Sequence, residues 1–318
     1  MKKILFAVHR YAPYPGGSEN NVKILAEECV RRGYDVTVLA GQHKGHLNNV
    51  KVTSDLNIIK QNFDLIIVHG GDVYIQNFVL SNAKNISSPI LYLLILPSNS
   101  EVCLKALQDA KYIGCSTIED WEHVKKHNVE YKSINFSYPI DIKISNGNLG
   151  FKKKYNITTE KMFISSGGFW HHKGMNELVS IFDKLPIKNT TLVLTGYQNK
   201  DLMPKITDNI KCFLLEDRQE VLNAIKETDL YILNSFQEGF GLVLLESMYN
   251  KTPWAARNIA GAKLMKDHGY VYNTPQELMK YILNFKKDDD KIKKAFDYVL
   301  ETHASENAIK EILKILNN

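Results

Sequence analysis

Residues 234–248 read NSFQEGFGLVLLESM and follow Asp229–Leu233, whose last four residues form a short apolar run that is typical of a buried strand. Gly239 and Gly241 free the backbone for close contact with a ligand, and the apolar residues after them predict a helix that ends near Asn250. The first N–H groups of a helix have no acceptor within it, so a helix that begins after a strand and a Gly-rich loop suits an anion. This strand, loop and helix indicate an α/β fold with a ligand site at the loop.

Two carboxylates flank the predicted helix start. Glu238 falls in the loop, and Glu246 falls about one and a half turns into the helix. The pair suits a nucleotide sugar, because one carboxylate can bind ribose hydroxyls and the other sugar hydroxyls while backbone amides hold the diphosphate. A surface helix with an exposed Glu246 is the alternative. The neighbouring helix residues are apolar without a clear polar face, so we expect a buried Glu246 that requires a partner.

A second Gly-rich loop, SSGGFWHHKG at 165–174, also joins a predicted strand to a predicted helix. Gly167 and Gly168 let the backbone approach a ligand, and Lys173 is placed to reach a phosphate charge. A lysine that is merely solvated at this position is the alternative. It would oppose the helix dipole, which favours an anionic partner.

No metal site is expected from the sequence. His171 and His172 are adjacent, so their side chains point apart, and no third ligand is evident. The cysteines have no metal-ligand or redox spacing and fall in apolar periodic segments, at positions Cys29, Cys103, Cys115 and Cys212. We therefore expect a cytoplasmic protein without metal or cofactor. Peripheral association with a membrane surface is the alternative.

The amino-terminal half contains a third loop of this kind. PGGSE at 15–19 follows the apolar strand predicted at Lys3–Val8, and Ser18 is a candidate N-cap for a helix that Gly33 ends. An ordinary strand-to-helix turn is the alternative, since many parallel sheets carry glycine there. The loop lacks the spaced glycines of the dinucleotide fingerprint, so a Rossmann dehydrogenase gains little support.

Length and composition indicate two soluble domains. The chain has 318 residues, of which 44% are hydrophobic and 24% charged, and it has no apolar run near the ~20 residues that span a bilayer. The stretch Pro139–Lys154 is rich in turn residues. We place an amino-terminal Rossmann-like domain at 1–148, a second Rossmann-like domain at 149–300, and a carboxyl-terminal helix at 301–318.

Strands alternate with helices throughout, which argues for parallel sheets covered on both faces. Helices are expected after Thr117, at Gly174–Leu185 and Glu220–Glu227, and predominantly from Pro275 onward. Besides those above, the predicted strands are Asp35–Ala40, Asp64–Val68, Ile90–Leu96, Tyr112–Cys115, Lys132–Phe136, Met162–Ser166, Thr191–Thr195, Lys211–Leu215 and Thr252–Ala256.

These segments together resemble the family 4 glycosyltransferases of the GT-B fold, whose signature is a Glu, seven residues and a second Glu. Glu238 and Glu246 match that signature closely, and Lys173-Gly174 resembles the family's Lys-Gly. Further likenesses to the family are Pro15–Glu19, Asp64–His69, Ser116, Tyr138–Asp141, Leu194–Gly196, Thr252–Ala256 and Ala260–Ala262. The resemblance covers most of the chain.

The resemblance implies two Rossmann-like domains that face a cleft, with an acceptor domain at 1–148, a nucleotide-sugar domain at 149–300, and a helix at 301–318 that packs back toward the first domain. It also implies a metal-independent enzyme that retains the anomeric configuration of the transferred sugar. By this implication Glu246 holds the ribose and Glu238 the donor sugar, with Glu238 and Lys173 as catalytic residues. The diphosphate faces Lys173 and the amides around Phe240, Gly241 and Leu242. The other donor-binding residues are Gly167 and Gly168 of the same domain and Gly16 and Gly17, which close over the phosphates from the first domain.

Two departures from the family pattern matter. Gly168 stands where the family commonly has an Arg five residues before its Lys, so either Lys173 works with another cation, Arg257 or Arg10, or the phosphate is held more weakly. The segment Leu94–Pro97 lacks the family's His after its fourth strand, and His69 is one candidate substitute.

The acceptor stays open. A lipid-linked acceptor or a saccharide is the default for the family, and modified DNA bases are an alternative that the net charge of +5 permits. A nucleotide-sugar epimerase of the same architecture would need acid and base groups for elimination and re-addition. A non-catalytic nucleotide-sugar binder would explain the missing Arg and His, but the retained Glu238, Glu246 and Lys173 argue against it.

Overall fold

The computed structural model of the protein describes residues 1–14, 16–41, 45–70, 73–196, 200–204, 207, 209–215 and 217–317. The chain forms two compact units. The first unit comprises Met1–Asp141 together with Thr302–Asn318, and the second comprises Ile142–Glu301.

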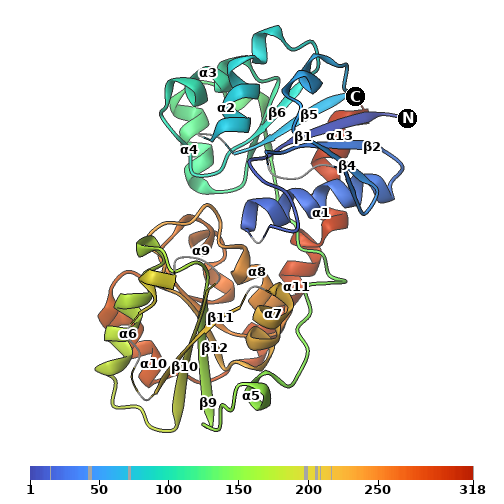
Figure 1. Ribbon diagram of the computed structural model, residues 1–318. Coiled ribbons are helices and arrows are strands. Elements are labelled where there is room, and N and C mark those ends of the chain that lie inside the picture. The colour runs from blue at the N-terminus through green and yellow to red at the C-terminus, as the bar shows by residue number, and fades with distance from the viewer. Residues whose placement is uncertain are drawn as a thin grey trace. The chain divides into compact units, whose positions relative to one another are not determined.

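The first unit is built on an eight-stranded sheet in the order β3-β4-β2-β1-β5-β6-β7-β8 (Figure 1). The paired strands are parallel except for the antiparallel pair β3 and β4. The strands are β1 (Lys3–Ala7), β2 (Asp35–Leu39), β3 (Gly45–Leu47), β4 (Val50–Thr53), β5 (Leu65–His69), β6 (Ile90–Leu93), β7 (Tyr112–Cys115) and β8 (Ser133–Asn135).

Side chains alternate across β1 to fill both faces of this sheet. Leu5 and Ala7 belong to one continuous core with apolar residues of α2 (Tyr74–Ser81), α3 (Glu101–Asp109) and α4 (Ile118–Lys126). The helix α1 (Gly17–Arg31) packs against β2 and β4 and buries one apolar stripe. Short 3₁₀ turns join several elements, at Leu56–Lys60, Ala83–Asn85 and Glu130–Lys132.

The second unit has a parallel sheet in the order β11-β10-β9-β12-β13-β14. Its helices α6 and α10 lie on one face, and α7 lies on the other (Figure 1). The strands are β9 (Lys161–Ser166), β10 (Thr190–Gly196), β11 (Ile210–Leu214), β12 (Leu230–Leu233), β13 (Trp254–Arg257) and β14 (Tyr270–Tyr272). The helices are α5 (Phe151–Lys154), α6 (Met175–Asp183), α7 (Arg218–Glu227), α8 (Leu242–Tyr249), α9 (Ala260–Leu264), α10 (Pro275–Leu283) and α11 (Asp289–His303).

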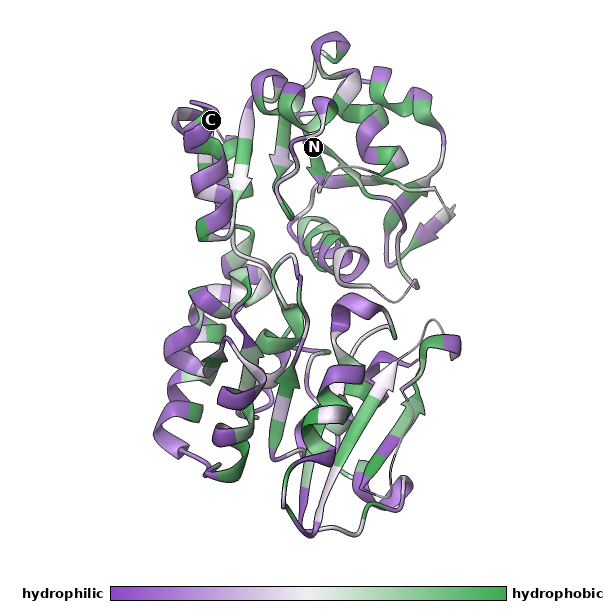
Figure 2. Ribbon diagram, turned by 90° about the vertical axis from the view of Figure 1, so that its left-hand side faces the viewer, coloured by the Kyte–Doolittle hydropathy of each residue, from purple (hydrophilic) through white to green (hydrophobic). Residues whose placement is uncertain are grey.

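The strands of both sheets are mostly hydrophobic, and most helices carry a hydrophobic and a hydrophilic side, as buried sheets between helix layers require (Figure 2). Among the described residues no helix is both long enough and apolar enough to cross a bilayer.

The last helices, α12 (Ser305–Ala308) and α13 (Lys310–Asn317), belong to the first unit. Ile140 N donates a hydrogen bond to His303 O at 2.7 Å, and Ser305 N donates one to Ile140 O at 3.0 Å. These bonds form a short parallel bridge between Ile140 and Ala304. The bridge joins the end of the segment Met1–Asp141 to the start of the segment Thr302–Asn318, the two parts of the chain that form the first unit.

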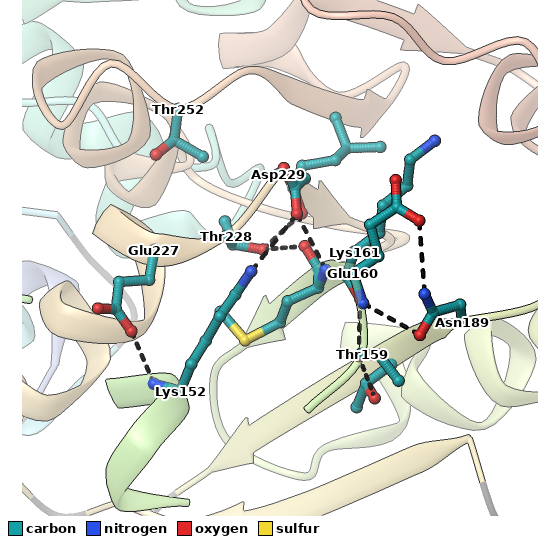
Figure 3. A network of polar contacts seen from close by, with 12 residues as sticks. Lys152, Thr159, Glu160, Lys161, Asn189, Glu227, Thr228, Asp229 and Thr252 are labelled. Carbon is teal, nitrogen blue, oxygen red and sulfur yellow. Dashed lines mark hydrogen bonds and ion pairs between the residues drawn. The ribbon is translucent and has the colours of Figure 1, made fainter. Parts of the chain in front are cut away.

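A polar network fastens the start of the second unit to the amino ends of its strands (Figure 3). Glu227 accepts hydrogen bonds from the backbone N–H groups of Gly150 and Lys152, both at 2.6 Å. Asp229 accepts from Met162 N at 3.0 Å and pairs with Lys287 at 2.9 Å. The network therefore ties α5 to α7 and to the sheet, at the edge opposite to the loops that follow the strands.

Burial alone would raise the pKa of Asp229, but its surroundings have the opposite effect. The hydrogen bond from Met162 N–H and the ammonium groups of Lys287 and Lys152 outweigh the burial. They hold the pKa of this carboxyl below its usual range, so Asp229 carries its charge at neutral pH.

The alternation of strands and helices is confirmed, and two local predictions need correction. Thr117 caps α4 through a hydrogen bond from Asp120 N to its hydroxyl at 3.1 Å, and Gly33, just beyond the end of α1, has a positive φ of 84°, both as expected. Ser18 is not an N-cap, because α1 already begins at Gly17 with Gly16 as its cap and no side-chain cap bond. The predicted strand Ile90–Leu96 ends at Leu93. In the loop PGGSE, Pro15 lies outside the described residues.

Candidate functional site

The two Gly-rich loops of the second unit meet at the carboxyl edge of its sheet. Lys173 Nζ lies 2.5 Å from Glu238 Oε1, and Ser235 Oγ donates a hydrogen bond to the same oxygen at 2.7 Å. The Lys173 side chain is 20% exposed and that of Glu238 is 15% exposed. A cation and a carboxylate from separate loops thus form one partly open polar site.

Backbone geometry brings Lys173 to this position. The loop turns at Gly174, whose φ of 66° is left-handed, and a Cβ there would lie 2.4 Å from Asn234 O. Phe236 N donates a hydrogen bond to His172 O at 2.7 Å, which joins the two loops directly. Gly167 lies against the aliphatic stem of Lys173, and a Cβ added to Gly167 would be 3.5 Å from Lys173 Cε, an ordinary van der Waals distance. Gly168 is buried beside it.

The helix α8 begins at Leu242, after Gly241 with a φ of 88° as its N-cap. The N–H groups of Leu242 and Val243 come before the first intrahelical bond, that of Leu244 donates to Gly241 O at 2.9 Å, and the cap residue supplies no side-chain bond. Phe240 is buried at 3% exposure, and the close approach of Gly261 to its carbonyl oxygen fixes the loop from behind. The helix start near Glu238 can therefore hold an anion, as the sequence predicts.

Glu246 is buried at 5% exposure on α8, as expected, and its partner is Arg218. Arg218 Nη2 donates to Glu246 Oε1. The Arg218 side chain is 39% exposed, and its guanidinium is charged at neutral pH. The sequence indicated that Glu246 needs a partner but not which residue it is, because Arg218 lies 28 positions away on another helix.

Arg257 lies in a second ionic cluster of this unit. Its Nη2 donates to Glu177 Oε2 and, at 3.1 Å, to Asn234 Oδ1. Asn234 is fully buried and also donates to Gly174 O at 2.7 Å. Arg257 is thus joined through Asn234 to the loop that carries Lys173, but among the described residues Arg257 makes no hydrogen bond or ion pair with Glu238 or Lys173.

Titratable groups near the loops are shifted by burial. Burial and the neighbouring Lys173 lower the pKa of His172, and burial raises the pKa of Tyr231, whose hydroxyl lies 2.8 Å from Ser166 Oγ. His172 is therefore neutral at pH 7 and Tyr231 protonated. The described residues contain no group of three or more His, Cys, Asp and Glu side chains that could hold a metal ion.

The Gly loop of the first unit holds a carboxylate. Glu19, buried at 5% exposure, lies against Gly16 so closely that an added Cβ would be 2.1 Å from its Oε2. Arg10 Nε lies 3.1 Å from Glu19 Oε1, and the Arg10 guanidinium covers the ring of Tyr14 at 3.7 Å. Gly17 is the first residue of α1. Arg10 thus has a carboxylate partner of its own within the first unit.

His69 ends β5 in the first unit and is buried at 2% exposure. Neither of its ring nitrogens has a hydrogen-bond partner among the described residues. Its ring packs edge-on against Tyr138 with centroids 6.3 Å apart. Burial lowers the pKa of His69 to about 4, so the imidazole is neutral at physiological pH.

Comparison with solved structures supports this architecture. The chain is 17% identical to Alr3699/HepE from Anabaena, solved in complex with UDP and glucose, over 100% of both chains with a TM-score of 0.82. It is 14% identical to sucrose-phosphate synthase from Thermosynechococcus elongatus, over 100% of this chain and 98% of that one, with a TM-score of 0.80. The catalytic domain of starch synthase IV from Arabidopsis thaliana, bound to ADP and acarbose, is 13% identical over 99% and 98% of the chains, with a TM-score of 0.70.

These likenesses define an α/β protein of the GT-B fold. The model of the family described as glycosyl transferases group 1 matches residues 150–314, a little over half of the 318 residues. The chain therefore belongs to this family, and it is a glycosyltransferase. No match was found among curated protein sequences.

Proposed function

We propose that the protein is a retaining glycosyltransferase that moves a hexose or related sugar from a nucleotide-diphosphate sugar to a lipid-linked or saccharide acceptor. The observation that carries the proposal is the meeting of Lys173, Glu238 and the start of α8 at one edge of the sheet. UDP and glucose in the complex of Alr3699/HepE support the class of donor.

In this reaction the bond between the anomeric carbon and the diphosphate breaks, and a bond to an acceptor oxygen forms on the same face. The proton of the acceptor hydroxyl leaves with the diphosphate. Lys173 and the N–H groups at the start of α8 stabilise the charge that develops on the leaving group. Glu238 binds hydroxyls of the donor sugar and Glu246 those of the ribose. No step uses a metal ion.

In the structure, the charges of Lys173 and Glu238 compensate each other. The same lysine can instead bind an anionic ligand when one enters the site. A diphosphate that approaches Lys173 competes with Glu238 for the ammonium group, and Ser235 can still donate to the released carboxylate. Both Lys173 and Ser235 donate to Oε1, so Oε2, which accepts from no described residue, is available for a sugar hydroxyl. The paired state avoids an uncompensated charge in a site that is at most 20% exposed.

A transfer assay in the presence of a chelator tests the proposal. Release of nucleotide from a panel of nucleotide sugars identifies the donor, and NMR of the product gives the configuration of the new bond. We expect retention, activity that the chelator does not change, and loss of transfer in Glu238→Ala and Glu246→Ala with folding preserved. Near-normal turnover in both variants would remove the site assignment, and an inverted product would remove the proposed stereochemistry.

A further inference from the structure

Arg218 has an unusual position for a basic residue. It is the first residue of α7, where the positive end of the helix dipole disfavours a cation. The helix start is already capped by Asp217, which accepts a hydrogen bond from Gln219 N at 2.9 Å. Arg218 therefore does not contribute the cap, and its place in the fold requires another explanation.

The explanation is its contact with Glu246. Figure 1 shows α7 close to α8, and the two helices are in contact, so that the Arg218 guanidinium reaches the Glu246 carboxylate. Glu246 is 5% exposed, whereas the Arg218 side chain is 39% exposed. The pair thus has a buried acid and a base that keeps contact with solvent.

The contact uses only part of each group. Glu246 is the only hydrogen-bond partner of the Arg218 side chain within the part of the chain that the structure describes. A guanidinium has five N–H donors, so others remain for a ligand. Glu246 Oε1 accepts from Arg218, whereas Oε2 accepts from no described residue. One carboxylate oxygen is therefore shared with Arg218 and the other is open.

We propose that Arg218 is a positioning and specificity residue of the nucleotide site, which fixes Glu246 so that Oε2 binds one ribose hydroxyl in preference to the other. This inference rests on the proposed function, in which Glu246 binds the ribose. A free carboxylate can accept from both hydroxyls of a ribose, one at each oxygen. Here Oε1 already accepts a charge-assisted bond from Arg218, which crowds it and makes it a weaker acceptor than the open Oε2, so the two hydroxyls contribute unequally.

The test compares deoxynucleotides by calorimetric titration without metal. UDP, GDP and ADP are titrated first, and the tightest binder is then compared with its 2′-deoxy and 3′-deoxy analogues. We expect one analogue to bind at least about tenfold more weakly, the effect of losing a hydrogen bond to a charged group, and the other to bind within about threefold of the parent. This comparison needs no variant, so it does not depend on how a substitution affects folding.

The variant Arg218→Gln then tests the role of the guanidinium. We expect weaker binding of the parent nucleotide and affinities for the two analogues that agree within about threefold. Lys226→Gln is the matched control, because Lys226 is a cation of the same helix that contacts Asn146 rather than the site. Its discrimination should equal that of the wild type.

The inference would be overturned if both analogues lost affinity equally in the wild type, or if Arg218→Gln distinguished the two analogues as well as the wild type does. Either result, with the parent nucleotide still bound, would leave the proposed function standing. Binding of none of the three nucleotides by the wild type would overturn the proposed function as well.

Discussion

Replacing Lys173 by Met removes the cation that the account assigns to the leaving group and keeps an apolar stem of similar length. A unit charge about 5 Å from a phosphate, at an effective dielectric constant of about 20, contributes about 3 kcal/mol. Each ~1.4 kcal/mol changes a rate tenfold, so kcat should fall by about 10²-fold. The 20% exposure of the side chain allows some solvent screening, which places the expected loss between about tenfold and about 10²-fold.

The assay is steady-state release of nucleotide from the preferred donor, with a thermal unfolding curve for each variant. Folding should change little, because Glu238 keeps the hydroxyl of Ser235 as a donor. Lys184→Met is the matched control, since Lys184 is an exposed lysine at the end of α6, away from the carboxyl edge. A folded Lys173→Met enzyme with kcat within about threefold of the wild type would refute the role of this ammonium in the reaction.

Three further predictions concern stability. Asp229→Asn should lower the free energy of unfolding at pH 7 by about 1–2 kcal/mol. Because the pKa of Asp229 is depressed in the folded state, the deficit should shrink as the pH falls through that pKa, and a deficit independent of pH in denaturant titrations would contradict it. Gly174→Ala should cost about 2 kcal/mol or more, because its φ is 66° and its Cβ would meet Asn234 O; an unchanged melting temperature would contradict this. His69, with a pKa of about 4 in the fold against 6.5 ordinarily, contributes stability that is complete above pH 6.5 and is lost toward pH 4. His69→Phe should flatten thermal stability across that window, and an unaltered pH profile would exclude this effect.

Local sequence signals located most of the secondary structure. Short apolar runs such as Leu230–Leu233 marked the buried parallel strands, and the helix expected after Thr117 is α4, which Thr117 caps. The hairpin of β3 and β4 was not predicted, because these strands have only three and four residues. The helix α2 was not predicted because it begins after Val73 without a side-chain cap, whereas α3 was missed although Ser100 caps it. The start of α1 was placed too late, since a Ser looked like a better cap than the preceding glycine.

The candidate site was predicted in its residues but not in its contacts. The glycines and acids at 234–248 indicated a ligand loop, and the apolar neighbours of Glu246 indicated its burial. The pairing of Lys173 with Glu238, and of Glu246 with Arg218, depends on how strands and helices far apart in the sequence meet. No local spacing contains that information.

The sequence shows which residues are cations, but it does not show which of them have carboxylate partners outside the site. Arg257 and Arg10 were both candidates to assist Lys173. The structure pairs Arg257 with Glu177 and Arg10 with Glu19. Their assistance to Lys173 therefore stays a prediction, and each would have to leave a carboxylate partner to act on a diphosphate.

Calorimetric titration with nucleotide sugars, on the wild type and on Glu246→Ala, tests the central claim most directly. The account predicts that one nucleotide sugar binds the wild type without metal, and that its affinity falls by at least about tenfold in a folded Glu246→Ala. Binding that is equal in both proteins would show that the carboxyl edge of the second sheet is not where the nucleotide sugar is held.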